Sequence, residues 1–393
     1  MSTTLIDDVL DYIFQTCSIS SLALISRVSF HTRELALPHL LRRVYLDRNP
    51  QQVLTFLNFI IDNAHDSDLG IISEPGRRVF ELELHIFAFK TYVLNKKEGE
   101  YKPVENEEYP ISTWAHMLAK ALTLMPNLRS FTLRDETEEI FTYSPDFGPT
   151  LLNLPQLTSL ILWGIGPNTS LSFGMAIDTL KGANKLQALY LLSDVDEMEV
   201  VAHEGVGRFL SHYSVHWTDL SLSGFDLRTF LQEDEHRLDN SRVTFPAVGK
   251  LEIENCEFSL EGLATAFPAL HTFHHRSVFL RPNSPRPRQN QVSFPNLISI
   301  KGRYRDINAI LNSNASRDHV RRAVITSRWD DDDIAYAVPK AAPHLKSLHF
   351  SQSNVKPLAW WQGLGETLPE LTYLDITLYA RNGLDLIVSL LSD

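Results

Sequence analysis

A short template, Leu-x-x-Leu-x-Leu, recurs from the middle of the chain to its end, with other apolar residues replacing Leu at some positions. From Leu128 onward, successive copies begin 22 to 31 residues apart. This spacing predicts one strand per copy, with the first, fourth and sixth template positions facing a common core and the other residues returning the chain. A single copy cannot bury its apolar face alone, so the copies must stack on one another. The copies begin at Leu41, Val79, Leu128, Leu157, Leu186, Trp217, Val248, Leu270, Leu297, Val320, Leu345 and Leu371, and the first two are more widely spaced.

Proline marks the entrance to most of these strands. In seven copies, among them MPNL at 125–128 and LPEL at 368–371, a Pro stands just before the first template residue. Because Pro cannot continue a helix and favours extended geometry in the residue before it, it marks the junction between a return helix and the next strand. The pattern therefore predicts an α/β architecture.

Composition narrows the class of protein further. Leu accounts for 57 of the 393 residues, and the formal charge of −12 argues against a protein that coats nucleic acid through its overall field. The two cysteines, Cys17 and Cys256, cannot form a disulfide framework, which fits a reducing compartment. The chain start lacks the pattern of a secretion signal, and no apolar stretch approaches the roughly 20 residues of a membrane helix. We therefore expect a cytosolic or nuclear protein without a membrane or nucleic-acid partner.

The template resembles the leucine-rich repeat family in its irregular, fungal-type form. The resemblance covers residues 128–376 well and residues 41–90 loosely. At the ninth position, where that family usually has Asn or Cys, the copy at Val248 carries Cys256, whereas the copies at Leu186 and Leu371 carry Asp194 and Tyr379. The resemblance implies an α/β solenoid over residues 41–393, a horseshoe with parallel strands on its concave face. Two stretches that interrupt the pattern, 95–110 and 281–288, are predicted to be surface loops because one is charged and the other is rich in Pro and Arg.

Residues 1–40 form a different, helical module in this interpretation. Between residues 5 and 14 the apolar side chains fall into two adjacent rows at helical spacing, which predicts a wide apolar stripe. Shorter helices are expected in 20–28 and in 32–37, the latter ending at Pro38. A unit this small is marginal alone, and its stripe is wider than so small a core can use. The two rows are Leu5, Val9 and Ile13, and Ile6, Leu10 and Phe14.

This module resembles an F-box, on the strength of Leu5, Asp8, Val9, Leu10, Ile13, Phe14, Leu22, Leu24 and Val28. It differs from the F-box pattern at Ile6, where Pro is usual, and at Ser29, where Cys is usual. The resemblance implies a substrate-recognition subunit of a cullin-based (SCF-type) ubiquitin ligase, which binds a Skp-family adaptor through the helices and a protein substrate through the repeats. The adaptor-binding residues would be Leu5, Ile6, Val9, Leu10, Ile13 and Phe14. The alternative is a leucine-rich-repeat interaction scaffold whose helical start is only an end cap.

No pattern in the chain predicts catalysis. Nucleotide-binding glycine motifs, a nucleophile elbow, HExxH and CxxC pairs are all missing from the sequence. His271 and His274 are three apart in an expected strand and so diverge, while His212 and His216 have no third ligand. The run Asp330–Asp333 lacks the Gly and the distal Glu of a calcium loop. We therefore expect no enzyme, no cofactor and no metal.

The outward strand positions suggest where a substrate would bind. The third, fifth and following odd template positions point away from the core, and they hold large apolar residues in early copies and cations in later ones. Clustered cations on a chain of charge −12 would attract an acidic or phosphorylated substrate segment. The alternative is that acids such as Glu252 and Glu254 neutralise them internally. The predicted substrate-binding residues are Ile161, Trp163, Tyr190, Leu192, His274, Arg276, Lys301, Arg303 and Arg322.

Overall fold

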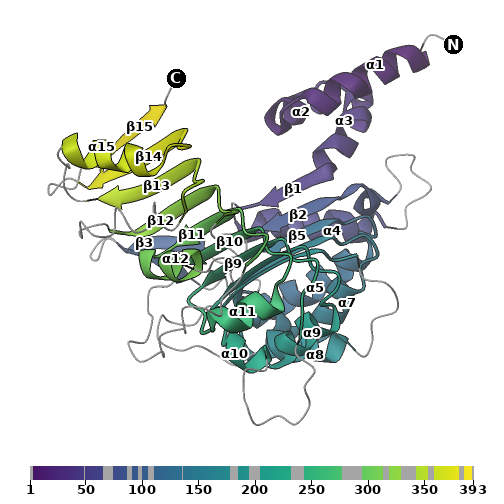
Figure 1. Cartoon of the computed structure of the whole chain (residues 1–393). Helices are drawn as coiled ribbons and strands as arrows, with labels where there is room; N and C mark the ends of the chain where they lie inside the picture. Colours follow the sequence, from purple (N-terminus) through teal and green to yellow (C-terminus); the bar gives the residue numbers. More distant parts are fainter. Residues whose placement is uncertain are drawn as a thin grey trace. The chain divides into compact units, whose positions relative to one another are not determined.

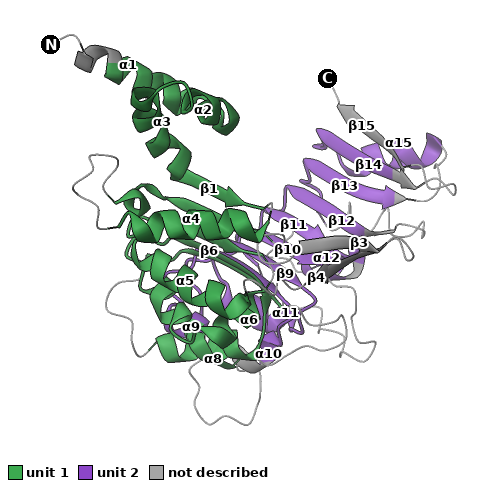
Figure 2. Cartoon of the chain, turned by 180° about the vertical axis from the view of Figure 1, so that it is seen from behind, with its two compact units in different colours: residues 1–194, 204–209 green, residues 195–203, 210–393 purple. Residues whose placement is uncertain are grey.

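The structure, a computed structural model, divides into two compact units (Figure 2). Unit 1 comprises residues 1–194 and 204–209, and unit 2 comprises residues 195–203 and 210–393. Each unit is described by itself. The residues described are 3–47, 49–64, 74–85, 91–95, 100–104, 110–134, 136–177, 185–193, 204–231, 243–276, 294–312, 318–328, 342–352, 358–379 and 385–391.

Three helices open unit 1 (Figure 1): α1 (Thr3–Thr16), α2 (Ile19–Ile25) and α3 (Phe30–Arg42). The side chain of Ser18 caps α2, and Ser29 and Thr32 form a capping box at the start of α3. The prediction that the third helix ends at Pro38 is wrong, because α3 runs through it to Arg42. Pro38 lacks only its own N–H, and burial of Ala36 and Leu41 on either side holds the helix together.

The strands of unit 1 follow in chain order as a parallel sheet. The third template position of each copy pairs with the third position of the next, for example Ser130 with Ser159 and Ser159 with Ala188. The return segments lie against one side of these strands (Figure 2). The strands are β1 (Arg43–Leu46), β2 (Glu81–Leu84), β5 (Ser130–Leu133), β6 (Ser159–Ile165) and β7 (Ala188–Ser193). The return segments contain α4 (Pro50–Asp62), the 3-10 helix η1 (Pro75–Arg78), α5 (Ile111–Thr123), α6 (Thr137–Tyr143), α7 (Phe147–Leu152) and α8 (Pro167–Ala176), and the chain passes into unit 2 within α9 (Glu204–His212).

Unit 2 continues the same repeat, again with third positions in register. Its last strand departs from the pattern and pairs antiparallel with β14. The strands are β8 (Asp219–Ser223), β9 (Lys250–Glu254), β10 (Thr272–Arg276), β11 (Ser299–Gly302), β12 (Arg322–Arg328), β13 (Ser347–Gln352), β14 (Tyr373–Tyr379) and β15 (Asp385–Leu391). The described helices of this unit are α10 (Leu227–Phe230), α11 (Leu260–Ala266), α12 (Tyr304–Leu311) and α15 (Leu358–Thr367).

The template positions predicted to face the core do so. From the copy at Val79 to the copy at Leu345, every first, fourth and sixth residue is buried. In the last copy, Leu371 and Leu374 are only half-buried. The parallel strands, their common register and their buried template positions make both units a solenoid of the leucine-rich repeat type.

The two stretches that interrupt the template are residues 95–110 and 281–288. The stretch 95–110 was expected to be a loop, but Asn95 ends β3 (Thr91–Asn95) and β4 (Glu100–Val104) lies within it. The two strands pair antiparallel, so cross-strand hydrogen bonds satisfy a backbone that the charged composition suggested was solvated. Residues 96–99 and 105–109, and the predicted loop 281–288, lie outside the described residues.

Candidate functional site

The two apolar rows of helix α1 lie in different surroundings, one against the core of the module and the other towards solvent. Phe14 is buried with Leu22 and Ala36 in the core of the helical module, and Leu10 packs against that core. Val9 and Ile13, from the other row, are 54% and 44% exposed. Because α1 cannot turn both rows towards the other two short helices, one row is left facing solvent.

Apolar side chains are also exposed elsewhere on the module. Tyr12 extends the outward row of α1, because it lies three residues from Val9 on the same side of the helix. Ile19 and Leu24 on α2, Val28 in the following turn and Phe30 on α3 are all more than half exposed. We call these seven residues the outer apolar set: Val9, Tyr12, Ile13, Ile19, Leu24, Val28 and Phe30.

Polar contacts fix α1 against α3 and so fix which row faces outward. The ring Nε2 of His39 lies 2.7 Å from Asp11 Oδ1, and that of His31 lies 2.8 Å from Asp7 Oδ1. Hydrogen bonding to His39 is the largest cause that lowers the pKa of Asp11, against a smaller opposing effect of burial. His39 also packs edge-on against Phe14, with ring centroids 6.4 Å apart.

The six predicted adaptor-binding residues therefore divide into three groups. Leu5 and Ile6 belong to α1, but their side chains lie outside the described residues. Val9 and Ile13 point outward, whereas Leu10 and Phe14 contribute to the core. Sequence reasoning missed Tyr12, Ile19 and Phe30, although helical spacing from Val9 would have found Tyr12.

The apolar part of the predicted substrate surface lies on β6 and β7. Ile161 pairs in register with Tyr190, and Trp163 pairs with Leu192. All four side chains are half-buried on the face away from the core, as the alternation predicts. The guanidinium of Arg134 lies 4.9 Å from the ring centroid of Trp163 and also pairs with Glu83, at 2.9 Å. Unit 1 therefore presents a partly apolar strand face bordered by an ion pair.

Two of the five predicted basic residues of that surface, His274 and Arg276, are paired with acids. His274 Nδ1 lies 3.9 Å from Glu252 Oε2, and Arg276 Nε lies 3.5 Å from Glu254 Oε1. Interaction with His274 is the first cause that lowers the pKa of Glu252, and the charges of Lys250 and Lys301 add to it. The internal neutralisation that the sequence left as an alternative thus operates between β9 and β10.

The remaining predicted cations lie on the next repeats. Lys301 pairs in register with His274 on β10 and is half-buried, and Arg322 opens β12 and is exposed. Arg303 was expected on the strand, but β11 ends at Gly302 and Arg303 is the N-cap residue of α12. The strand ends there because the chain enters a helix directly, so Arg303 is positioned by that helix start rather than by the sheet.

The buried titratable groups of unit 2 belong to the repeat core. His275 occupies a sixth template position, is 1% exposed, and its Nδ1 lies 3.0 Å from Asp306 Oδ2 on α12. Cys256, at the ninth position, donates its thiol to the carbonyl of Leu222 at 3.3 Å, and burial raises its pKa to about 12. A thiol with this pKa stays protonated at neutral pH and is therefore a structural donor rather than a nucleophile.

Within the described ranges, no group of three or more His, Cys, Asp or Glu side chains could hold a metal ion. His216 lies beyond the end of α9, so it does not share a helix face with His212. The run Asp330–Asp333 lies outside the described residues. The same part of the chain contains no helix with the length and apolar character needed to cross a membrane.

Comparisons with known proteins give similarity to solved structures only. No family model matches the chain, and no curated protein matches it. The complex of Rad7 and Elc1 from yeast is 15% identical with a TM-score of 0.38, covering 97% of this chain and 92% of that chain. The leucine-rich repeat-containing protein LegL7 from Legionella pneumophila is 14% identical with a TM-score of 0.34, covering 69% and 72%. The complex of TLR13 with ssRNA13 is 13% identical with a TM-score of 0.32, covering 66% and 31%. Because these TM-scores are below 0.5, the fold assignment stands on the chain's own strand register and burial.

Proposed function

We propose that this chain is the substrate-recognition subunit of an SCF-type ubiquitin ligase. The outer apolar set of the helical module binds a Skp-family adaptor, which connects the chain to a cullin scaffold. The strand face of the repeats binds the protein that is to be ubiquitinated. In this role the chain itself performs no bond chemistry and acts in the cytosol or the nucleus.

The exposure of the outer apolar set is the observation that carries the proposal. Among the described residues of the module, Phe14, Leu22 and Ala36 are buried in its core, while seven large apolar side chains are between 44% and 76% exposed. Burying one such side chain contributes about 1.5–3 kcal/mol, so a partner that covers several of them gains substantial affinity. Large apolar side chains left exposed in this number on so small a module favour a protein-binding site.

The strand face supports the second half of the proposal. Ile161, Trp163, Tyr190 and Leu192 offer apolar contact to a substrate. Lys301 and Arg322 offer cationic contact, because the described acids of β9 pair with β10 instead. An apolar substrate segment fits the strand face of unit 1, and an acidic or phosphorylated segment fits the strand face of unit 2.

A second candidate function is an interaction scaffold in which the helices only cap the solenoid. Helix α3 packs against β1 and η1, and Leu41 and Leu46 at this junction are buried. Solenoids need such caps to cover the apolar face of a terminal repeat. A cap, however, requires only the inward residues of the module and gives the outer apolar set no role.

Binding of a purified Skp-family adaptor to the full chain separates the two candidates. We expect the parent chain to co-elute with the adaptor and the variant Val9→Asp/Ile13→Asp to lose the complex, because two charges would have to be buried. The control variant Leu171→Asp/Met175→Asp adds the same charges at exposed apolar positions of α8, which are 62% and 58% exposed, and should bind normally. Unchanged binding by a folded Val9→Asp/Ile13→Asp protein would leave the scaffold as the function.

A further inference from the structure

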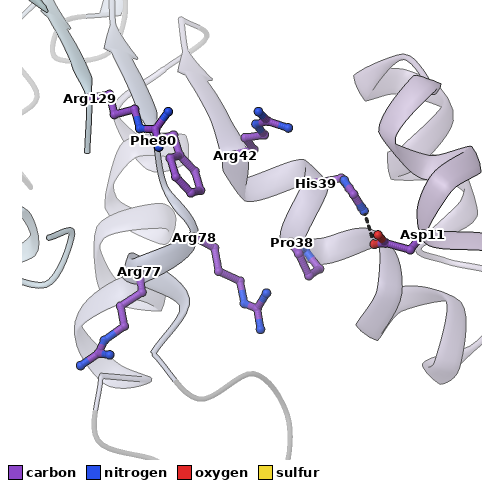
Figure 3. Close-up of a pocket in the computed structure, with 8 residues that line it drawn as sticks. All are labelled: Asp11, Pro38, His39, Arg42, Arg77, Arg78, Phe80 and Arg129. Atoms are coloured by element: carbon purple, nitrogen blue, oxygen red, sulfur yellow. Dashed lines mark hydrogen bonds and ion pairs between the residues drawn. The ribbon is translucent and has the colours of Figure 1, made fainter. Parts of the chain in front are cut away.

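A pocket of about 480 Å³ lies in unit 1 where α3 meets the first repeats (Figure 3). Four arginines, Arg42, Arg77, Arg78 and Arg129, line it together with the ring of Phe80. They come from the end of α3, from η1 and from the residues just before β2 and β5. A volume in this range is typical of a site for a small ligand or a single side chain.

The repeat itself brings three of the lining residues together. Arg42, Phe80 and Arg129 occupy the second template position of three successive copies. The N–H of Phe80 donates to the carbonyl of Arg42 at 3.1 Å, and the N–H of Arg129 donates to the carbonyl of Phe80 at 2.8 Å. The three residues are therefore adjacent rungs of one ladder, although about forty or more residues separate each from the next in the chain.

The ring of Phe80 holds two of the guanidinium groups in place. The guanidinium carbon of Arg129 lies 5.2 Å from the ring centroid, and that of Arg42 lies 5.9 Å from it. Such cation–π contacts restrain a guanidinium but bring no negative charge, and they leave its N–H donors available. Phe80 thus positions the two cations without neutralising them.

Two acids near the pocket, Glu74 and Asp11, already have other partners. Arg77 pairs with Glu74, and Asp11 accepts the hydrogen bond of His39. Among the described residues, Arg42, Arg78 and Arg129 have no carboxylate partner. Three like charges in one pocket repel one another, and an anionic ligand would relieve that repulsion.

We propose that this pocket binds the phosphoryl group of a phosphate monoester or pyrophosphate. Such a group carries about −1.5 to −2 charges and three acceptor oxygens, whereas a carboxylate carries only one charge. Guanidinium groups bind phosphate oxygens in pairs, and the planar forks held by Phe80 suit that geometry. The group could belong to a small molecule or to a phosphorylated side chain, since both present the same chemistry. The proposal does not depend on adaptor binding and involves none of the outer apolar set.

Calorimetric titration of the full chain with inorganic pyrophosphate, at about 0.15 M salt, tests the proposal. We expect saturable binding by the parent chain and at least about ten-fold weaker binding by Arg78→Gln/Arg129→Gln, because the variant lacks two charged donors to the phosphate oxygens. Both arginines are exposed, so the variant should fold normally. The control Arg27→Gln/Arg33→Gln removes the same charge from exposed positions of the helical module and should bind as the parent does.

A third variant, Phe80→Leu, keeps all the charges and removes the ring. It should also weaken binding, which a purely diffuse electrostatic attraction would not predict. Failure of the parent to bind, or equal weakening in the Arg27→Gln/Arg33→Gln control, would overturn the proposal. A parallel titration with N-acetyl-O-phosphoserine amide distinguishes the sources: binding of this probe too supports a phosphorylated side chain, and binding of pyrophosphate alone supports a small phosphate compound.

Discussion

The repeats bury their apolar side chains, whereas the helical module leaves many of its apolar side chains exposed. From the copy at Val79 to the copy at Leu345, the three inward template positions are all buried, and the strand face carries ion pairs such as Arg276 with Glu254. Of the module's described residues, three are buried in its core and the seven of the outer apolar set are exposed. In a stack, neighbouring repeats cover the apolar side chains of each repeat from both sides. In a bundle of three short helices, one apolar side remains uncovered. Under the proposed function, the side of the module that is left over is the surface that the adaptor covers.

The largest expected effect comes from a substitution in the buried core of the repeats. Phe131 is fully buried on β5, and its ring lies 6.2 Å from that of Phe147. Phe131→Ala should lower the free energy of unfolding by about 3–5 kcal/mol, because it leaves a cavity that the stacked repeats cannot close. Denaturant titration of the full chain measures this change. A loss of less than about 1 kcal/mol would contradict the packed core described above.

The next effect concerns the two rows of α1. Ile13→Ala should weaken adaptor binding by about 2–3 kcal/mol and leave the unfolding free energy nearly unchanged, because Ile13 is an outward residue. Leu10→Ala should instead lower the unfolding free energy, since Leu10 packs against Phe14, Leu22 and Ala36. Adaptor titration and denaturation of both variants test this reversal. If Leu10→Ala loses adaptor affinity without losing stability, the assignment of the rows is wrong.

A smaller effect tests how polar groups join neighbouring repeats. The carboxylate of Glu138 on α6 accepts from the backbone N–H groups of Asn168 and Thr169, at 2.6 and 3.0 Å, and from the hydroxyl of Thr169 at 2.7 Å. It thereby caps the start of α8. Glu138→Ala should lower the unfolding free energy by about 1–3 kcal/mol. Glu139→Ala, one residue away and exposed, is the control and should have no measurable effect.

The smallest effect is a pH dependence in the module. Because His39 lowers the pKa of Asp11 from 3.8, this carboxylate stabilises the folded state at pH values above its unfolded pKa. That contribution is lost as the pH falls through the lowered pKa of the folded state. Asp11 is about half exposed, so Asp11→Asn should cost less than about 1 kcal/mol at neutral pH. Denaturation of both proteins at several pH values should show the difference shrinking below pH 3.8. A difference that persists in acid would mean that the carboxylate charge is not its source.

Much of the fold could be predicted because the same template positions are buried in one copy after another. Apart from β3, β4 and β15, each described strand begins at or near a third template position, where alternation required it. Pro38 misled the prediction because tertiary burial outweighed a local preference. The hairpin of β3 and β4 was missed because cross-strand pairing does not depend on apolar residues alone. The antiparallel strand β15 was also missed, because its sequence does not follow the template.

The candidate site was harder to predict than the fold. Both rows of α1 are apolar, so only the packing of α2 and α3 decides that Leu10 faces inward and Ile13 outward. Pairing of His274 with Glu252 follows from the register of β9 with β10, which composition does not contain. The arginine pocket joins residues far apart in the chain. Its signal was the shared second template position, which the sequence reasoning did not use.

Hydrogen exchange of the full chain, alone and with a Skp-family adaptor, tests the central claim most directly. Slower amide exchange in the adaptor complex would identify the segments that the adaptor covers or stabilises. The outer apolar set predicts slower exchange in α1 and α2, with no change in β5, β6 and β7. Unchanged exchange in α1 and α2, with protection on those strands instead, would contradict the assignment of the helical module as the adaptor-binding surface.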